Sequence, residues 1–198
     1  MKLKQKIALV TGSGSGIAKE TASLFASEGA SVISVDLNYD TAFETLEVLR
    51  KYNDFSSAIA CDVSSDKDVV KVVNFAIEKY GTIDILFNGA GIHSRNAMIS
   101  EGTPEEIWDR VIAVNLKGTY LMNYRVVPIM KSNKNGSVIN VSSIMGLVGY
   151  SEGFGVGLDP YPPSKGGVIQ LTRNLAVDLA KYNIRVNCIC PGYIKTNL

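Results

Sequence analysis

The sequence has 198 residues, 46% of them hydrophobic, and a formal net charge of +1. This composition is typical of a folded domain, and the mixed charges give no basic footprint for nucleic acid. No apolar stretch is long enough to cross a membrane, and the short run at 7–10 is not a signal peptide. We therefore expect a cytoplasmic protein without nucleic-acid or membrane partners.

Cysteine and histidine are scarce in this chain. The three cysteines, Cys61, Cys188 and Cys190, form no CxxC pair, which favours reduced, buried thiols over disulfides or a metal site. His93 is the single histidine, so a multi-histidine metal centre is excluded, and we expect no metal. A surface loop is the simplest interpretation of His93, and a place in a substrate pocket is the alternative.

Short apolar runs alternate with amphipathic segments along the chain. In order, the pattern predicts a strand at 6–12, a helix around 17–25, strands at 31–36 and 57–63 on either side of a helix at 41–52, a helix at 69–80, a strand at 83–91, a helix from 104 to about 130, a strand at 137–143, a helix at 162–182 and a strand at 184–190. Such alternation indicates one α/β domain with a parallel sheet covered by helices on both faces. Ligands of such sheets lie beyond the carboxyl ends of the strands.

The first strand is followed by a glycine-rich turn, Gly12 to Gly16. Glycines allow a tight turn and let a phosphate approach the amides of a helix N-terminus, although a plain strand–helix loop could look the same. Asp36 ends the second strand about twenty residues later, where an acid can accept hydrogen bonds from a ribose hydroxyl. A solvated loop aspartate is the alternative. An acid here would repel a 2′-phosphate, which favours NAD over NADP.

The other strand ends also carry small or polar residues. Asp62 and Val63 suit the edge and face of an adenine, and 88–91 allows close backbone approach. Ser142 and Ser143 follow the fifth strand, and 191–196 follows the sixth. A purely structural sheet has little reason for such residues at every strand end.

Tyr161 and Lys165 lie four residues apart at the start of a predicted helix, so their side chains share one face. A nearby ammonium favours the phenolate form of a tyrosine and lowers its pKa. Pro162 and Pro163 fit only the first helical turn, so we expect Tyr161 at the N-cap. The prolines would then stiffen the entry and direct the phenol toward Lys165.

Taken together, "TGSGSGIA", Asp36, "CDV", "NGAG", Asn115, "VSS", "YPPSK" and "PGYIKT" resemble the motifs of the short-chain dehydrogenase/reductase family, in order and over the whole chain. The resemblance implies a single Rossmann-like domain that binds NAD(P) and transfers a hydride between nicotinamide and a secondary alcohol or ketone. It also implies assembly as a homodimer or homotetramer on two long helices.

The resemblance assigns roles to individual residues. Tyr161 would be the general acid/base, Lys165 would hold the nicotinamide ribose and lower the tyrosine pKa, Ser143 would bind the substrate oxygen, and Asn115 would support a water relay. The expected cofactor-binding residues, besides Tyr161 and Lys165, are Gly12, Ser15, Gly16, Ile17, Asp36, Asp62, Val63, Asn88, Gly89, Ala90, Ile194 and Thr196.

The chain departs from the family pattern in four places. Ala18 replaces a usual glycine, and Gly89 replaces the usual second asparagine of an Asn-Asn-Ala-Gly motif. The segment 143–161 is long and glycine-rich, and we expect it to shape substrate choice or form a mobile lip. The sequence ends at Leu198, before the family's usual substrate lid, last strand and last helix, so we expect it to be a fragment of a longer chain.

The leading hypothesis is an NAD-dependent oxidoreductase acting on a small alcohol or ketone, such as a sugar or polyol. A 3-oxoacyl reductase is the rival enzyme, although such enzymes usually use NADPH, which Asp36 disfavours. A dinucleotide-binding module without catalysis is the rival from another class, and the presence of Ser143, Tyr161, Lys165 and Asn115 argues against it.

Overall fold

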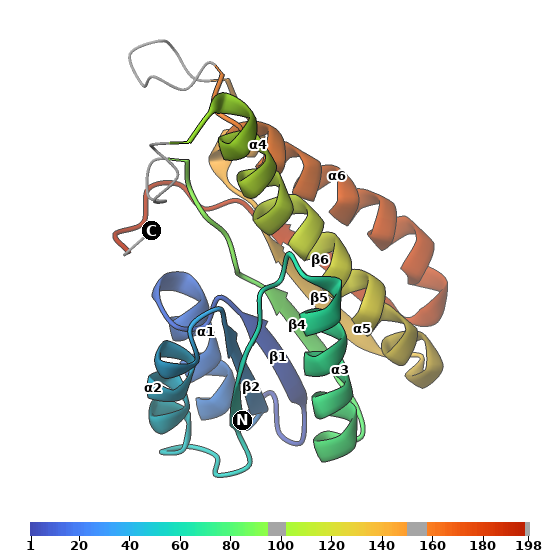
Figure 1. Cartoon of the computed structure of the whole chain (residues 1–198). Coiled ribbons are helices and arrows are strands. Elements are labelled where there is room, and N and C mark those ends of the chain that lie inside the picture. Colours follow the sequence, from blue (N-terminus) through green and yellow to red (C-terminus); the bar gives the residue numbers. More distant parts are fainter. Residues whose placement is uncertain (95–101, 150–157, 197–198) are drawn as a thin grey trace.

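The computed structural model describes residues 1–94, 102–149 and 158–196 (Figure 1). Its strands are β1 (Ile7–Thr11), β2 (Ser31–Asp36), β3 (Ser57–Ala60), β4 (Ile85–Asn88), β5 (Gly136–Val141) and β6 (Ile184–Ile189). Its helices are α1 (Gly16–Ser27), α2 (Tyr39–Leu49), α3 (Asp66–Tyr80), α4 (Pro104–Ile112), α5 (Thr119–Asn133) and α6 (Tyr161–Leu179). A π-helical segment, Ala113–Gly118, joins α4 to α5, and single 3₁₀ turns lie at Ile144–Gly146 and Ala180–Tyr182.

The six strands form one sheet in the order β3-β2-β1-β4-β5-β6, and every neighbouring pair is parallel. The predicted α/β class is therefore confirmed. The order reverses between β1 and β4, because the chain first builds outward to β3 and then returns to the other side of β1. This reversal leaves a crevice beyond the carboxyl ends of β1 and β4, where dinucleotides bind in folds of this kind.

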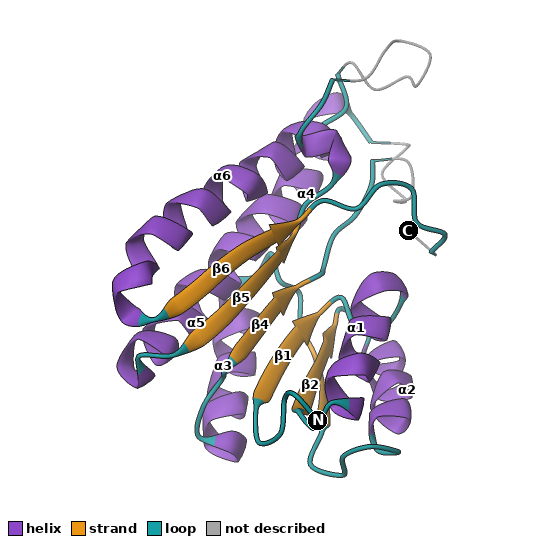
Figure 2. Ribbon diagram, turned by 180° about the vertical axis from the view of Figure 1, so that it is seen from behind, coloured by secondary structure: helices purple, strands orange, loops and turns teal. Residues whose placement is uncertain are grey.

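Helices cover the two faces of the sheet differently, as Figure 2 shows from behind. On one face α3, α5 and α6 bury a large apolar core against the strands, with Leu9, Leu86 and Met122 fully buried. On the other face α1 packs through Ala18, Ala22 and Ala26, which recur at every fourth residue. These small side chains let α1 lie close to β1, which holds the glycine turn over the strand end.

Several predicted boundaries differ from the structure. The predicted strands 57–63 and 83–91 end at Ala60 and Asn88, because the aspartate and glycine residues that follow leave the sheet to form loops. The predicted helix from 104 contains the π-helical segment and continues to Asn133. Its N-terminus carries a capping box, in which Thr103 and Glu106 exchange hydrogen bonds between side chain and backbone.

The start of α6 also differs. The N-cap is Pro160, and Tyr161 is the first helical residue, so the N-cap prediction was wrong by one position. The steric bias against helical geometry before a proline is outweighed by two hydrogen bonds. The Tyr161 N–H donates to the Asp159 carboxylate at 2.7 Å, and the Ser164 N–H donates to the Pro160 carbonyl at 3.0 Å.

All three cysteines are free, but only Cys61 is buried. Cys188 on β6 and Cys190 just after it are half-buried, because β6 is an edge strand of this sheet. Among the described residues, no helix has both the length and the apolar character needed to cross a membrane.

Candidate active site

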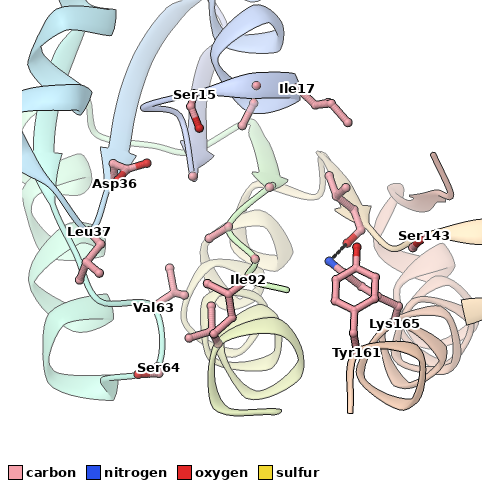
Figure 3. Close-up of a pocket in the computed structure, with 18 of the residues that line it drawn as sticks. Ser15, Ile17, Asp36, Leu37, Val63, Ser64, Ile92, Ser143, Tyr161 and Lys165 are labelled. Atoms are coloured by element: carbon pink, nitrogen blue, oxygen red, sulfur yellow. Dashed lines mark hydrogen bonds between the residues drawn. The ribbon is translucent and has the colours of Figure 1, made fainter. Parts of the chain in front are cut away.

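One cavity of about 1010 Å³ lies beyond the carboxyl ends of the strands (Figure 3). It is lined by the glycine turn, the ends of β2 and β3, the segment after β4, one face of α4, Ser142 and Ser143, the start of α6 and the segment after β6. Residues far apart in the sequence thus meet at one edge of the sheet, as the predicted topology requires.

The glycine turn holds the backbone in a conformation that favours glycine. Gly12 has φ +70°, and a Cβ added there would lie 2.7 Å from the Ala90 backbone. Gly16, with φ +55°, is the first residue of α1, whose N-terminus has no side-chain cap and no acid in its first turn. This helix N-terminus faces the cavity, and its positive end fits an anionic pyrophosphate.

Asp36 lies beside this turn and already accepts two backbone hydrogen bonds. Its Oδ2 accepts from the Gly14 N–H at 2.9 Å and its Oδ1 from the Asn38 N–H at 3.1 Å. Each carboxylate oxygen keeps a further lone pair, so the side chain is fixed in place and can still accept from ribose hydroxyls. Asp36 lies at the end of β2, as predicted, and its side chain lines the cavity.

Asp62 and Val63 also line the cavity, together with Ser64. The Asp62 Oδ1 accepts from both the N–H and the hydroxyl of Ser64, at 2.9 and 2.7 Å, which fixes its side chain. Val63 packs against Gly118, where an added Cβ would lie 2.7 Å from the valine Cγ2. An apolar side chain beside a fixed carboxylate is suited to an adenine ring.

Of the predicted cofactor-binding residues at the end of β4 and just after it, some line the cavity and one does not. Gly89 and Ala90 line the cavity, but the buried side chain of Asn88 does not, because its amide donates to Asn140 on β5 at 2.8 Å. The structure therefore places Asn88 as a link within the sheet beneath the cavity. The expected contact of Asn88 with adenosine stays a prediction, and it would have to use the backbone of this residue.

Asn115 is fully buried in the π-helical segment and does not line the cavity. Its Oδ1 accepts from the Ile92 N–H at 2.8 Å, and its Nδ2 donates to the Ile92 carbonyl at 2.9 Å and to the Ser164 hydroxyl at 3.1 Å. The side chain thus ties the segment after β4 to α6. The expected part in a water relay stays a prediction, and it would have to use other atoms of this residue.

Tyr161 and Ser143 meet at one end of the cavity, on the first turn of α6 and at the end of β5 (Figure 3). Burial raises the pKa of Tyr161, a hydrogen-bonding interaction with the Ser143 side chain opposes this rise, and the Asp159 carboxylate adds to it. The expected lowering of this pKa by Lys165 is not found in the protein alone, because the loss of hydration outweighs the other effects.

Lys165 lies one helical turn beyond Tyr161 and faces it, with its Nζ 5.5 Å from the centre of the phenol ring. The Nζ donates to the Val141 carbonyl at 2.9 Å. Burial lowers the pKa of Lys165 to about 8. The predicted pairing of these two side chains on one face is confirmed.

Ile194 and Thr196 of the segment after β6 line the cavity as predicted. Thr196 lies against the glycine turn, 3.2 Å from the place where a Cβ at Gly16 would be. Of the long segment before Tyr161, residues 150–157 lie outside the described residues, so its predicted part in substrate choice stays a prediction.

Sequence reasoning missed several residues of this site. The cavity wall includes Leu37, Ile92 and one face of α4 and the start of the π-helical segment, formed by Glu106, Asp109, Arg110 and Ala113. The helical spacing of these four residues could have shown that they share a face, but not that this face meets the cavity. The ring of His93 lies 4.7 Å from that of Tyr161, centre to centre, so the alternative interpretation of His93 gains support.

Three features occur together: this strand order, a glycine turn at the end of the first strand, and a Tyr–Lys pair beside a serine. Together they define the class of dinucleotide-binding oxidoreductases. The family model for short chain dehydrogenases matches residues 6–198. The chain therefore belongs to the short-chain dehydrogenase/reductase family, whose members are oxidoreductases.

Curated relatives and solved structures agree with this assignment. The chain is 42% identical over 199 residues to a 3-oxoacyl-[acyl-carrier-protein] reductase of Thermotoga maritima, covering 99% of this chain and 77% of the relative. It is similar to the solved structure of an NAD⁺-bound xylitol dehydrogenase, with a TM-score of 0.88 and 33% identity, covering 98% of this chain and 72% of that one. A levodione reductase structure matches with a TM-score of 0.88 and 33% identity, over 98% and 74% of the two chains.

Proposed function

We propose that this chain is an NAD-dependent dehydrogenase that transfers a hydride between nicotinamide and a small secondary alcohol or its ketone. The observation that carries the proposal is one continuous cavity with Asp36 on one wall and Tyr161, Ser143 and Lys165 on another. Asp36 suits the two free hydroxyls of an NAD ribose and repels the 2′-phosphate of NADP.

The residues present fit the cofactor. The uncapped N-terminus of α1 would hold the pyrophosphate, Asp36 the adenine ribose, and Asp62 with Val63 the adenine. Lys165 would hold the second ribose, and Ile194 and Thr196 would lie beside the nicotinamide half. When bound, the nicotinamide ring accepts or supplies the hydride.

The proton chemistry belongs to the chain's own side chains. The Ser143 hydroxyl would hydrogen-bond the substrate oxygen, and the Tyr161 phenol would give a proton to that oxygen in reduction or take one from it in oxidation. Because burial raises the pKa of Tyr161, the phenol is protonated at neutral pH, which suits the donor role. A positive charge brought into the cavity would act in the opposite direction and favour the base needed for oxidation.

Sugars and polyols are the proposed substrate class, and the likeness to the xylitol dehydrogenase structure supports it. A second candidate, a 3-oxoacyl thioester reductase, is favoured by the 42% identity to the Thermotoga relative. The two candidates differ in their expected cofactor. Cytoplasmic location and a homodimeric or homotetrameric state stay predictions, and sedimentation would check the latter.

Calorimetric titration with NAD and with NADP tests the cofactor, and turnover of xylitol, sorbitol, secondary butanol and acetoacetyl thioesters tests the reaction. We expect NAD to bind well and NADP weakly, and Tyr161→Phe to bind NAD normally but lose turnover. Tyr124→Phe, an exposed tyrosine on α5, is the matched control. Unchanged turnover in Tyr161→Phe would refute the mechanism, and tight binding of NADP would favour the thioester reductase.

A further inference from the structure

The first turn of α6 depends on one side chain for its hydrogen bonds. Pro162 and Pro163 have no N–H, and the N-cap residue Pro160 gives no side-chain cap. The Tyr161 N–H is therefore the first donor of the helix, and it donates to the Asp159 Oδ1 at 2.7 Å. The next donor, the Ser164 N–H, is satisfied by the Pro160 carbonyl. Asp159 thus fixes the backbone of the residue that carries the phenol.

The other carboxylate oxygen of Asp159 reaches a different part of the fold. Its Oδ2 accepts from the Ser94 hydroxyl at 2.5 Å, across 65 residues of sequence. Ser94 belongs to the segment after β4, which forms another wall of the site. One carboxylate therefore joins this segment to the start of α6.

The neighbour of Ser94 completes the cluster. The ring of His93 lies over that of Tyr161, with centres 4.7 Å apart and planes inclined by 31°. Holding Ser94 in place therefore also holds His93 against the phenol. The phenol therefore has His93 and Lys165 as neighbours, and the carboxylate of Asp159 lies at the backbone of the same residue.

We propose that Asp159 is a positioning residue of the reaction, which sets the direction of the Tyr161 phenol by joining Ser94 to the first turn of α6 and adds a negative charge beside it. The inference rests on the proposed function of Tyr161, and it assigns a role to a residue outside the Ser–Tyr–Lys set. The direction of the electrostatic effect agrees, since Asp159 contributes to raising the pKa of Tyr161.

Asp159→Asn separates charge from hydrogen bonding. The asparagine Oδ1 can still accept from the Tyr161 N–H, and its amide can donate to Ser94, so the geometry is kept while the charge is lost. Asp159→Ala and Ser94→Ala remove the link itself. Asp54→Asn, an exposed loop aspartate outside the cavity lining, is the matched control for the loss of a charge.

Titration of Tyr161 gives a readout that does not depend on the substrate. In the full chain labelled with ¹³C at tyrosine Cζ, the signal of Tyr161 is assigned among the 9 tyrosines by its absence in Tyr161→Phe. We expect its titration midpoint to move to lower pH in Asp159→Asn and to stay unchanged in Asp54→Asn. Within the described parts of the chain, His93 and Lys165 are the other ionisable groups in contact with the phenol, and both are kept in every variant. An unmoved or raised midpoint in Asp159→Asn would overturn the electrostatic part of the inference.

Turnover of the best alcohol in the panel tests the positioning part. A displacement of a catalytic group by about 1 Å can cost on the order of a hundredfold in rate, so we expect kcat to fall at least about tenfold in Asp159→Ala and less in Asp159→Asn, with NAD binding unchanged in both. Equal kcat in wild type and Asp159→Ala would overturn it. If Tyr161→Phe itself retained turnover, the proposed function would fail instead, and the two failures are therefore distinguishable.

Discussion

The methyl group of Ala18 lies where a side chain at Gly89 would have to be. A Cβ added to Gly89 would be 2.8 Å from the Ala18 Cβ and 2.8 Å from the Thr11 carbonyl oxygen. In the family pattern, position 18 is usually glycine and position 89 usually asparagine. The two residues that differ from the family pattern are thus in direct contact. The methyl group of Ala18 fills space that is left free because residue 89 has no side chain.

This contact predicts that the two positions are energetically coupled. Gly89→Ala alone should lower the free energy of unfolding by about 1 to 3 kcal/mol, because the added methyl overpacks the junction of α1 and β4. Combining it with Ala18→Gly should recover part of that loss. Recovery should be incomplete, because the added methyl still lies too close to the Thr11 carbonyl oxygen. A double-mutant cycle in urea measures the coupling, with Gly149→Ala, which points into open space, as control. Strictly additive effects would contradict the prediction.

Asp36 and Leu37 should control which dinucleotide binds. Leu37 is 67% exposed and lines the cavity next to the carboxylate. The double variant Asp36→Ala/Leu37→Arg removes a repelling charge and supplies a guanidinium for a phosphate, so we expect NADP to bind at least about tenfold better and NAD about tenfold worse. Calorimetry checks both affinities. Leu37→Ala alone should leave the preference for NAD in place, and a double variant that still prefers NAD would show that Asp36 does not discriminate.

Burial of Lys165 should make stability depend on pH in a defined window. The folded-state pKa of about 8 lies below the value of 10.5 for an exposed lysine. Between these pH values the unfolded chain holds a proton that the folded chain has released, so stability rises with pH, by about 3 kcal/mol in all. The difference in free energy of unfolding between wild type and Lys165→Met should rise from pH 8 to 10.5, as followed by urea denaturation.

Lys67→Met, which removes an exposed lysine from α3, is the matched control for that comparison. A difference between wild type and Lys165→Met that stays level or falls over the window would mean that the amine keeps its proton when buried. Lys165→Met should in addition lose turnover, since the side chain lies beside the phenol and the expected ribose site.

Asn115→Ala should destabilise the site and the fold together. The substitution leaves the partly buried N–H and carbonyl of Ile92 without their partner, and a fully buried unpaired group would cost about 1 to 3 kcal/mol. We expect a loss of about 2 to 4 kcal/mol in the free energy of unfolding, against little change for the exposed Asn74→Ala. Asn115→Asp should be no milder, because it turns an acceptor toward the Ile92 carbonyl. Wild-type stability in Asn115→Ala would show that water satisfies Ile92 equally well.

Much of the fold could be predicted because it depends on local patterns. Val/Ile-rich strands, the glycine turn and the Thr103–Glu106 capping box each specify their own segment, and the predicted alternation was confirmed by the parallel sheet. The pairing of Tyr161 with Lys165 also follows from helical spacing alone. These features need no knowledge of the rest of the chain.

Contacts between distant segments could not be predicted in this way. Nothing in the sequence near Asn88 shows that its side chain bonds Asn140 and leaves the cavity wall to its neighbours. The link between Ser94 and Asp159 spans 65 residues, and neither residue belongs to a recognisable motif. The pKa of Tyr161 likewise depends on burial, which is a property of the whole fold, so local charges gave the wrong direction for the protein alone.

The π-helical segment Ala113–Gly118 has a consequence for how this family member tolerates changes in length. In an α-helix, successive side chains are rotated by about 100° around the helix axis. The wider π-helical turn changes this rotation, so it sets the angle between the face of α4 that lines the cavity and the face of α5 that packs on the sheet. We expect that deleting a single residue there would turn the π-helical segment into ordinary α-helix and rotate Asn115 away from Ile92. A deletion of one residue in the helix formed by α4, the π-helical segment and α5 would therefore disturb the site more than a much longer deletion in a surface loop.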